Sequence, residues 1–298
     1  MTASNDSLRG KVLAHENLAK YNSWRVGGDA ERMYIPADKK DMEQFISGLS
    51  VDESVFWLGL GSNLLIRDGG IRGTVINVRA KVKQMNLLSD TEVYVECGVA
   101  SAHVARFCTE HGLAGAEFLA GIPGTMGGAL KMNAGAFGGE TWNLVQSVEM
   151  MPVGGKIRRA KMNEFEVSYR TVKNVANNCF LSTVLKLSRN ENNNGQEQIK
   201  KLLAKRALTQ PTNQPSCGSV FRNPTNDHAA RLIEASGLKG YRIGGAEVSE
   251  KHANFIVNTG GATAADIEQL IEYVQSEVAS QQGVKLRTEV CIVGDKLI

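Results

Sequence analysis

The 298-residue sequence lacks several features that define common classes of protein. Its five cysteines are scattered without a C-x-x-C pair, which favours free thiols in a reducing compartment over a zinc site or a disulfide framework. None of its five histidines lies four residues from another, so we expect no metal site. Basic and acidic residues nearly cancel, 34 against 31, and no Lys/Arg stripe is present, which argues against a nucleic-acid binder.

The sequence also has no long apolar run. No stretch of about 18 apolar residues could span a bilayer, and the N-terminus has no basic-then-apolar signal pattern. The glycosylation-acceptor match at Asn5-Asp6-Ser7 is therefore interpreted as a chance occurrence. These absences predict a soluble, cytoplasmic protein.

Helices and strands are both indicated, in an irregular order. Capping residues and 3.6-residue periodicity predict helices that start at Asp38 (with Asp41 in a variant capping box), Ser101 and Thr263. A polar linker over 189–195 precedes another helix, which ends at Thr209 and carries a solvated basic face. The strands are expected over residues 56–60, 74–78, 93–97, 180–187, 254–257 and 290–293. The fold class is therefore α+β, without the regular alternation of a doubly wound sheet.

Glycine is plentiful, with 31 residues, and it is concentrated in two places. The run Gly121–Gly139 holds seven glycines and one charged residue, and Gly59-Leu60-Gly61-Ser62-Asn63 follows an apolar strand. Because glycine weakens helices and strands, such runs favour bare backbone that approaches a large phosphate-bearing ligand. A dinucleotide-like cofactor is the interpretation we prefer, and a set of tight turns is the alternative.

The common nucleotide and hydrolase signatures do not match. The third glycine of a Rossmann fingerprint would fall on Leu64, and Gly155-Lys156 is followed by Ile157 where a P-loop needs Ser or Thr. Ser219 lacks the glycine flanks of a nucleophile elbow.

Six motifs together resemble one family, the UDP-N-acetylenolpyruvoylglucosamine reductases. In chain order they are SWRVGG from Ser23 to Gly28, LGLGSNLLIRDGGIRGTVI from Leu58 to Ile76, GIPGTMGGALKMNAGAFGGE from Gly121 to Glu140, Tyr169-Arg170, PSCGSVFRNP from Pro215 to Pro224, and Glu289-Val290. Each motif alone is a weak signal, whereas six in the family's order at compatible spacings are a strong one.

The resemblance implies an FAD-binding fold of the vanillyl-alcohol-oxidase type. Two α+β subdomains, residues 1–82 and 83–200, would hold FAD, and residues 201–298 would form an α+β substrate-binding domain. The short spacings resemble the family subtype that lacks an inserted tyrosine loop. Val172 stands where the family often has Ser, which leaves one local hydrogen bond in doubt.

The resemblance also implies a reaction and its residues. NADPH would reduce FAD, which would reduce UDP-N-acetylglucosamine enolpyruvate to UDP-N-acetylmuramate for peptidoglycan synthesis. Arg170 would hold the substrate carboxylate, Ser219 would protonate carbon, and Glu289 would polarise the carboxylate while itself protonated. Pattern alone instead favours a surface ion pair for Arg170, a polar strand residue for Ser219 and a cross-strand pair for Glu289.

Further contacts follow from the same resemblance. Cofactor contacts are expected from Gly59, Gly61, Ser62, Asn63, Leu64, Gly121, Ile122, Pro123, Gly124, Thr125, Gly127, Gly128, Ala129 and Asn133. Substrate contacts are expected from Tyr169, Arg222, Asn223 and Lys251, with Arg242 as a further guess from its charge. A monomer or weak homo-oligomer is expected. The alternatives are a flavin oxidase of the same fold, which would consume oxygen, and a nucleotide-binding regulatory module without redox activity.

Overall fold

The computed structural model describes residues 8–79, 81–175, 178–192 and 194–297, so the Asn5–Ser7 match lies outside the described residues. The chain divides into two compact units. The described residues of unit 1 fall within Met1–Leu13, Arg32–Leu60 and Gly73–Ala204. Those of unit 2 fall within Ala14–Glu31, Gly61–Arg72 and Lys205–Ile298. Each unit is built around its own apolar clusters, and each is described by itself below.

A four-stranded sheet begins the fold. Its strands, in the order in which they pair, are β1 (Lys11–Asn17), β2 (Asp29–Ile35), β5 (Ile71–Asn77) and β3 (Val55–Leu58). Strand β3 runs parallel to β5, from the Val55–Thr74 pair to the Leu58–Asn77 pair. Strand β3 ends at Leu58, so the first glycine motif follows it directly in the chain.

Helix α1 (Lys39–Ser47) is confirmed where its capping residues predicted it. The Asp38 carboxylate accepts a hydrogen bond from the Asp41 N–H, as an N-cap should. The reciprocal half of the expected capping box is absent, because the Asp41 carboxylate instead accepts from the Ala37 N–H and the Tyr34 hydroxyl. The Phe45 ring stacks on Tyr34 with centroids 3.7 Å apart, which packs the helix on β2.

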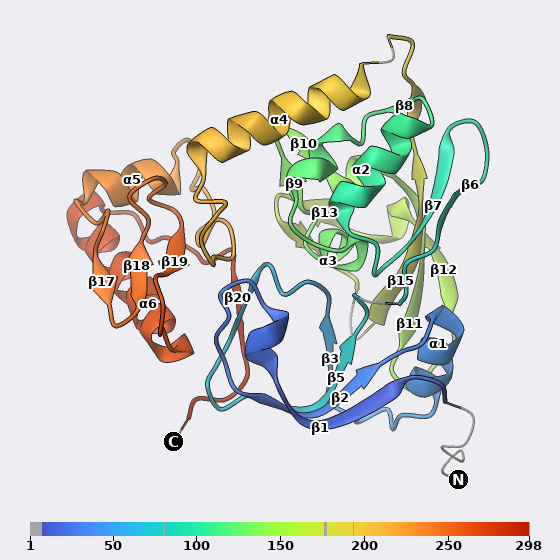
Figure 1. Ribbon diagram of the computed structural model, residues 1–298, viewed down its shortest axis with the longest axis horizontal. Coiled ribbons are helices and arrows are strands. Elements are labelled where there is room, and N and C mark those ends of the chain that lie inside the picture. The colour runs from blue at the N-terminus through green and yellow to red at the C-terminus, as the bar shows by residue number, and fades with distance from the viewer. Residues whose placement is uncertain (1–7, 80, 176–177, 193, 298) are drawn as a thin grey trace. The chain divides into compact units, whose positions relative to one another are not determined.

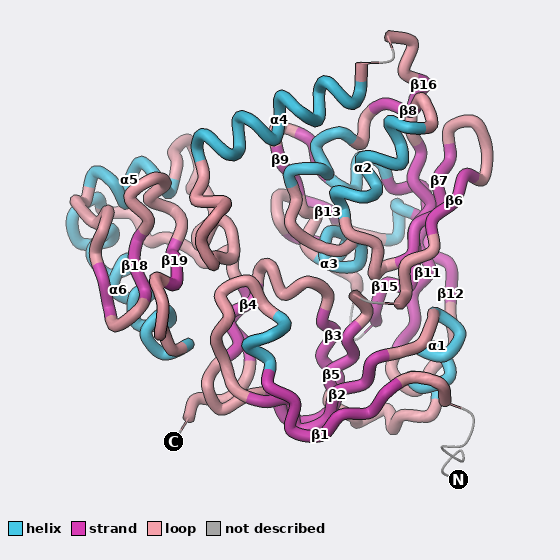
Figure 2. Tube along the Cα trace, viewed as in Figure 1, coloured by secondary structure: helices cyan, strands magenta, loops and turns pink. Residues whose placement is uncertain are grey.

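Unit 1 also contains an antiparallel five-stranded sheet, on the right of the view in Figure 2. Its strands, in spatial order, are β12 (Arg158–Lys161), β11 (Val145–Pro152), β15 (Asn178–Lys186), β7 (Glu92–Glu96) and β6 (Met85–Leu87). Helices α2 (Ser101–Glu110) and α3 (Met126–Lys131) share its apolar core, where the Trp142 side chain is 2% exposed. The Trp142 indole N–H donates to the Leu130 carbonyl, which ties the core to α3.

Short elements complete unit 1. The two-stranded pairs are β8 (Leu113–Ala114) with β16 (Ser188–Arg189), β9 (Gly135–Ala136) with β10 (Gly139–Glu140), and β13 (Val167–Ser168) with β14 (Thr171–Val172). The 3-10 helices are η3 (Glu117–Gly121), η4 (Thr141–Leu144) and η5 (Met162–Glu164). The second glycine run thus lies in short helices, turns and two-residue strands. At its glycines no side chain prevents other groups from approaching the backbone closely.

Unit 2 packs helix α6 (Ala264–Gln282) beside a small antiparallel sheet (Figure 1). The sheet consists of β17 (Arg242–Ile243), β18 (Ala246–Val248) and β19 (Ile256–Asn258), and α5 (Ala229–Ala235) packs against α6. Strand β4 (Leu64–Ile66) pairs in parallel with β20 (Cys291–Val293). The 3-10 helix η2 (Leu18–Tyr21) also belongs to this unit.

Helix α6 follows its sequence signals closely. Thr263 and Asp266 form the complete capping box, and Gly283 ends the helix with a left-handed φ of 69°. The apolar stripe predicted from the sequence is buried: Ile267, Leu270, Ile271, Val274 and Val278. Helix α4 (Gly195–Thr209) likewise ends where Pro211 predicted, and Lys200, Lys201 and Lys205 are exposed.

One capping prediction is wrong. Helix α2 was expected to be capped by Ser101, but Ala100 is the N-cap residue and Ser101 is the first helical residue. The Ser101 side chain is fully buried and makes no cap hydrogen bond, so helix capping does not account for a serine at this position. The predicted strands are confirmed in place with shifts of one to three residues at their ends. None of the helices in the described part of the chain combines the length and the apolar composition that a membrane crossing requires.

Candidate active site

The first glycine motif is a turn that only glycine can make at Gly61. This residue has φ of 64°, and a Cβ built there would lie 2.2 Å from the Tyr21 carbonyl oxygen. The Ser23 N–H donates to the Gly61 carbonyl at 3.2 Å. Two of the sequence motifs, the one at Ser23 and the one at Gly61, therefore meet within unit 2.

In unit 1 the two glycine-rich segments meet at Thr125. A Cβ built on Gly59 would lie 2.5 Å from Thr125 Oγ1, and one built on Gly128 would lie 3.8 Å from the same atom. The Thr125 hydroxyl is buried and has no hydrogen-bond partner among the described residues. Since an unpaired buried hydroxyl is unfavourable, an orphaned oxygen between two bare backbones fits a bound polar group such as a cofactor diphosphate.

A second orphaned hydroxyl belongs to Ser101, next to this point. The Ser101 N–H donates to the Gly124 carbonyl at 2.9 Å, and Ala100 forms an antiparallel bridge with Thr125. Ser101 Oγ is buried and also has no partner in the part of the chain that the structure describes. Thr125 of the second glycine run and Ser101 at the start of α2 therefore carry two buried hydroxyls that are unpaired among the described residues.

Gly127 packs tightly against the end of β7. Its N–H donates to the Cys97 carbonyl at 2.8 Å, and a Cβ built on it would lie 3.0 Å from the Cys97 Cβ. The neighbouring Met126 N–H donates to the Val99 carbonyl at 2.8 Å. The absence of a side chain at Gly127 therefore permits close backbone packing inside unit 1.

Arg170 lies in the turn between β13 and β14, with a left-handed φ of 53°. Its guanidinium donates to the Gly135 carbonyl at 2.7 Å and to the Asn133 carbonyl at 3.3 Å, and it stacks over the Tyr169 ring 5.1 Å from the centroid. A non-glycine residue with this φ is uncommon and costs about 1 kcal/mol or more, which is typical of functional positions.

Asn133 holds the loop that Arg170 contacts. It is fully buried, its amide donates to the Glu140 carboxylate at 2.9 Å and the Ser168 carbonyl at 3.2 Å, and its oxygen accepts from the Trp142 N–H. The Asn133 side chain therefore joins the second glycine run to the β13–β14 turn. Val172, where the resemblance led us to expect Ser, pairs with Val167 across that hairpin.

In unit 2, two of the three predicted catalytic residues, Ser219 and Glu289, lie on neighbouring backbone segments. Val220, which follows Ser219, accepts hydrogen bonds through its carbonyl from the N–H groups of Glu289 at 2.7 Å and Val290 at 3.3 Å. Phe221 and Thr288 form an antiparallel bridge beside them. Ser219 and Glu289 thus lie on paired segments, although they are 70 residues apart in the sequence.

The first glycine loop is attached to both of these segments. The Asn63 side chain donates to the Glu289 carbonyl at 3.0 Å, and the Cys291 N–H donates to the Asn63 carbonyl at 3.0 Å. The Cys217 thiol donates to the Leu64 carbonyl at 3.3 Å. Burial raises the pKa of the Cys217 thiol to about 12, so it stays protonated and acts as a buried hydrogen-bond donor.

The predicted substrate contacts have different surroundings. The Tyr169 side chain is exposed, Asn223 accepts from the Ala229 N–H at the start of α5, and the Lys251 ammonium donates to the Ala207 carbonyl at 2.6 Å. The Arg222 N–H donates to the Arg287 carbonyl, which continues the pairing of the Ser219 and Glu289 segments. Arg242 forms an ion pair with Glu247.

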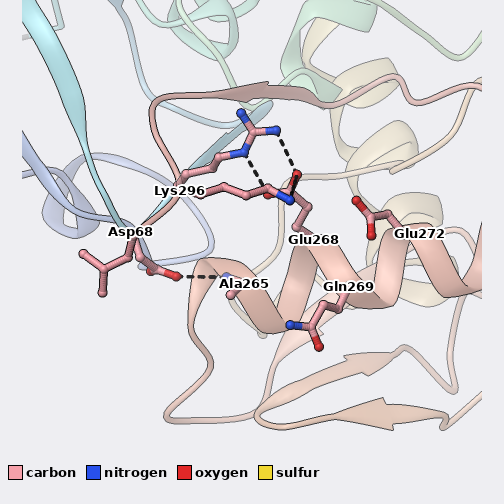
Figure 3. Close-up of a pocket in the computed structure, with 8 residues that line it drawn as sticks. Asp68, Ala265, Glu268, Gln269, Glu272 and Lys296 are labelled. Atoms are coloured by element: carbon pink, nitrogen blue, oxygen red, sulfur yellow. Dashed lines mark hydrogen bonds and ion pairs between the residues drawn. The ribbon is translucent and has the colours of Figure 1, made fainter.

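A charged pocket in unit 2 is lined by Arg67-Asp68, by one face of α6 and by Lys296-Leu297 (Figure 3). Arg67 donates two hydrogen bonds to Glu268, at 2.9 and 2.8 Å, and Asp68 accepts from the Ala264 and Ala265 N–H groups at the start of α6. Lys296 lies 3.8 Å from the Glu268 carboxylate. These interactions anchor the LGLGSNLLIRDGG motif to α6. They also pair the charges of Arg67 and Lys296 with that of Glu268.

One residue that the sequence interpretation did not assign, Asn254, contacts the Ser219 segment. Its amide bonds both the N–H and the carbonyl of Phe221, and the residue is 3% exposed. The sequence did contain one signal for this role: Asn254 is the polar first residue of the apolar run 254–257. That run was interpreted only as a strand.

Comparison with known proteins covers both parts of the chain. The family model for an FAD binding domain matches residues 33–161, and the model for the C-terminal domain of UDP-N-acetylenolpyruvoylglucosamine reductase matches residues 210–293. The first match contains the second glycine run, and the second contains Ser219 and Glu289.

Relatives match over nearly the whole length. The UDP-N-acetylenolpyruvoylglucosamine reductase of Methylococcus capsulatus is 58% identical over 287 residues, covering 96% of this chain and 94% of the relative. That of Nitrosococcus oceani is 54% identical, covering 97% of each. The crystal structure of the Thermus caldophilus enzyme superposes with a TM-score of 0.81 at 29% identity, covering 96% of this chain and 99% of the other.

The expected fold class, α+β with an FAD-binding part and a C-terminal domain, is confirmed by these matches. The resemblance noted in the six sequence motifs is confirmed as well. The chain belongs to the UDP-N-acetylenolpyruvoylglucosamine reductase family and is an FAD-dependent oxidoreductase.

Proposed function

We propose that this chain reduces UDP-N-acetylglucosamine enolpyruvate to UDP-N-acetylmuramate, with NADPH as the reductant and FAD as the cofactor. The observation that carries the proposal is the 58% identity with a reductase of this name over 96% of the chain. When bound, FAD would accept hydride from NADPH and transfer hydride to the terminal vinyl carbon of the substrate. One proton must then be added to the neighbouring carbon.

In this proposal Arg170 binds the substrate carboxylate. A guanidinium is permanently charged and can hold a carboxylate with two parallel hydrogen bonds. As hydride adds to the vinyl carbon, negative charge spreads into that carboxylate, so a fixed positive group stabilises the transition state. The hydrogen bonds from Arg170 to Asn133 and Gly135, and its place in a tight turn, support a preorganised position.

Ser219 is proposed as the proton donor and Glu289 as the residue that polarises the carboxylate. Serine is a weak acid, so its position relative to the accepting carbon has to be fixed. The pairing of the two segments through the Val220 carbonyl supports this pair of roles, because one backbone hydrogen-bond system fixes both residues. A hydroxyl that loses its proton to carbon would be reprotonated from solvent after turnover.

The FAD contacts are proposed as the sequence predicts them, on the two glycine segments. The orphaned hydroxyl of Thr125 between Gly59 and Gly128 supports this assignment. The substrate contacts, Tyr169, Arg222, Asn223 and Lys251, are proposed on the family resemblance. So is the division into residues 1–82, 83–200 and 201–298. A cytoplasmic location and a monomeric or weakly associating state remain predictions.

An anaerobic absorption experiment tests the function. The purified protein loaded with FAD should lose its visible flavin absorption when NADPH is added and regain it when UDP-N-acetylglucosamine enolpyruvate follows. The recovered product should be UDP-N-acetylmuramate in an amount equal to the NADPH consumed. A protein that takes up no FAD, or whose flavin absorption does not return with this substrate, would contradict the proposal.

A further inference from the structure

The backbone around Ser219 is held by one buried side chain, Asn254. Its oxygen accepts from the Phe221 N–H at 2.9 Å, and its amide donates to the Phe221 carbonyl at 2.8 Å. The Asn254 main-chain carbonyl also accepts from the Val220 N–H at 2.9 Å. Asn254 therefore satisfies three backbone groups of two consecutive residues, the N–H of Val220 and both the N–H and the carbonyl of Phe221.

Other backbone groups of the same segment bond the Glu289 segment. The Val220 carbonyl accepts from the Glu289 N–H at 2.7 Å, and the Arg222 N–H donates to the Arg287 carbonyl at 2.9 Å. The Val220–Arg222 segment therefore lies between Asn254 and Glu289. A shift of this segment would move Ser219 and Glu289 together.

Asn254 is itself rigidly placed. Its N–H donates to His252 Nδ1 at 3.3 Å, and it lies in the connection from β18 to β19, where the Ser249 N–H bonds the Phe255 carbonyl. The residue is 3% exposed, so its amide bonds are made away from solvent. A buried amide with both bonds made fixes its partner, whereas a lost bond leaves a buried group of Phe221 unpaired.

We propose that Asn254 is a positioning residue for proton delivery: it holds the Ser219 hydroxyl and the Glu289 carboxyl in register through the backbone of Val220 and Phe221. The inference rests on the proposed function, since it assumes the roles of Ser219 and Glu289 given above. Asn254 makes no contact with substrate in this account. It acts only on the step that consumes a proton, the reoxidation of the flavin by the substrate.

Two variants remove its hydrogen bonds in different ways. Asn254→Asp keeps the acceptor toward the Phe221 N–H but, when ionised, places a carboxylate against the Phe221 carbonyl. Asn254→Ser introduces no charge and is too short to reach both groups. Asn258→Asp is the matched control, because the Asn258 side chain donates to the Trp24 carbonyl and accepts from the Gly260 and Ala262 N–H groups. Its bond to the PSCGSVFRNP motif runs from its main-chain N–H to the Pro215 carbonyl, which the substitution keeps.

The experiment is anaerobic rapid mixing of each FAD-loaded protein with NADPH and then with the enolpyruvyl substrate. Reduction by NADPH should stay within about twofold of wild type, while reoxidation by substrate should fall about tenfold to a hundredfold in both Asn254 variants. The reoxidation rate of Asn254→Asp, divided by that of wild type, should rise as the pH falls. Burial raises the pKa of a carboxyl group, and the protonated form can again donate to the Phe221 carbonyl. The neighbouring titratable groups, His252 and Glu289, are present in both proteins, so their titration cancels in this ratio. The pH dependence of the ratio therefore reports on residue 254.

Wild-type reoxidation in both Asn254 variants, equal slowing of both half-reactions, or an Asn254→Asp ratio independent of pH would overturn the inference. So would loss of flavin or of cooperative melting in both variants while Asn258→Asp retains them, because the role would then be purely structural. A wild-type protein that substrate cannot reoxidise would instead refute the proposed function itself. The two failures are therefore distinguishable.

Discussion

At the scale of single residues, the Thr125 hydroxyl makes the most specific prediction about the cofactor. It is buried and has no hydrogen-bond partner within the described ranges of the chain, so Thr125→Val should leave the melting temperature of the FAD-free protein unchanged or slightly higher. If the hydroxyl bonds the cofactor, the same change should weaken FAD binding about threefold to tenfold, the equivalent of one hydrogen bond. Titration with FAD measures this effect.

Thr183 provides the matched control, because its equally buried hydroxyl donates to the Ser147 carbonyl at 3.0 Å. Thr183→Val should therefore lower the free energy of unfolding by about 1 kcal/mol and leave FAD affinity unchanged. Equal FAD affinity in Thr125→Val and wild type would show that the Thr125 hydroxyl does not contact the cofactor.

Arg170 makes a second prediction at this scale. Arg170→Lys keeps the charge but loses the planar pair of donors, so reoxidation of the flavin by substrate should fall about a hundredfold. Lys173→Gln is the control, because Lys173 lies on the same hairpin in an exposed ion pair with Glu166. Stopped-flow absorbance measures both variants, and a Lys variant as fast as wild type would remove the bidentate role.

At the scale of elements, α6 is attached to the first glycine motif by Arg67 and Glu268 (Figure 3). The hydrogen bonds and charge of Arg67 hold the pKa of the Glu268 carboxyl below its ordinary value of 4.5. A carboxyl whose pKa is lowered in the folded state stabilises the fold above its unfolded pKa, and this contribution is lost as the pH falls through the folded value.

Glu268→Gln should therefore lower the melting temperature by a few degrees at neutral pH. The difference from wild type should shrink as the pH falls below about 4.5, where the unfolded carboxyl becomes protonated. Glu272→Gln, one turn further along α6 and exposed, should change little at any pH. A melting difference for Glu268→Gln that does not depend on pH would contradict this role of the ion pair.

The elements that the sequence predicted are those with local signals. Helix α6 has a capping box, an apolar stripe and a terminal glycine within one segment, so every signal agrees. Strand β11 was not predicted, because register shifts after Val145 and Glu149 break its alternation of buried and exposed residues. Many other unpredicted strands have only two or three residues, too short for any periodicity.

The candidate site was predictable only in part, for the same reason. Ser219, Glu289 and Arg170 were proposed through motif resemblance, because no local pattern distinguishes them from ordinary polar residues. The left-handed turn at Arg170 and the Asn254 amide bonds depend on tertiary partners distant in the sequence. The Ser101 cap failed because the helix begins one residue earlier than its hydroxyl suggested.

At the scale of the whole molecule, cofactor binding should be visible as stability. A ligand that binds only the folded protein raises the free energy of unfolding, by about 2.7 kcal/mol at a hundred times its dissociation constant. Calorimetry of the FAD-free protein and of the same protein with increasing FAD should show a melting temperature that rises with FAD concentration. AMP at equal concentration is a control for the adenylate part alone. A melting temperature independent of FAD would contradict specific binding to the folded chain.

The central claim is that Ser219 supplies the proton in a flavin-dependent reduction. The most direct measurement is anaerobic double mixing of FAD-loaded Ser219→Ala, first with NADPH and then with UDP-N-acetylglucosamine enolpyruvate. We expect flavin reduction by NADPH at the wild-type rate and reoxidation by the substrate slowed about a hundredfold to a thousandfold. Reoxidation of the variant at the wild-type rate would contradict the account.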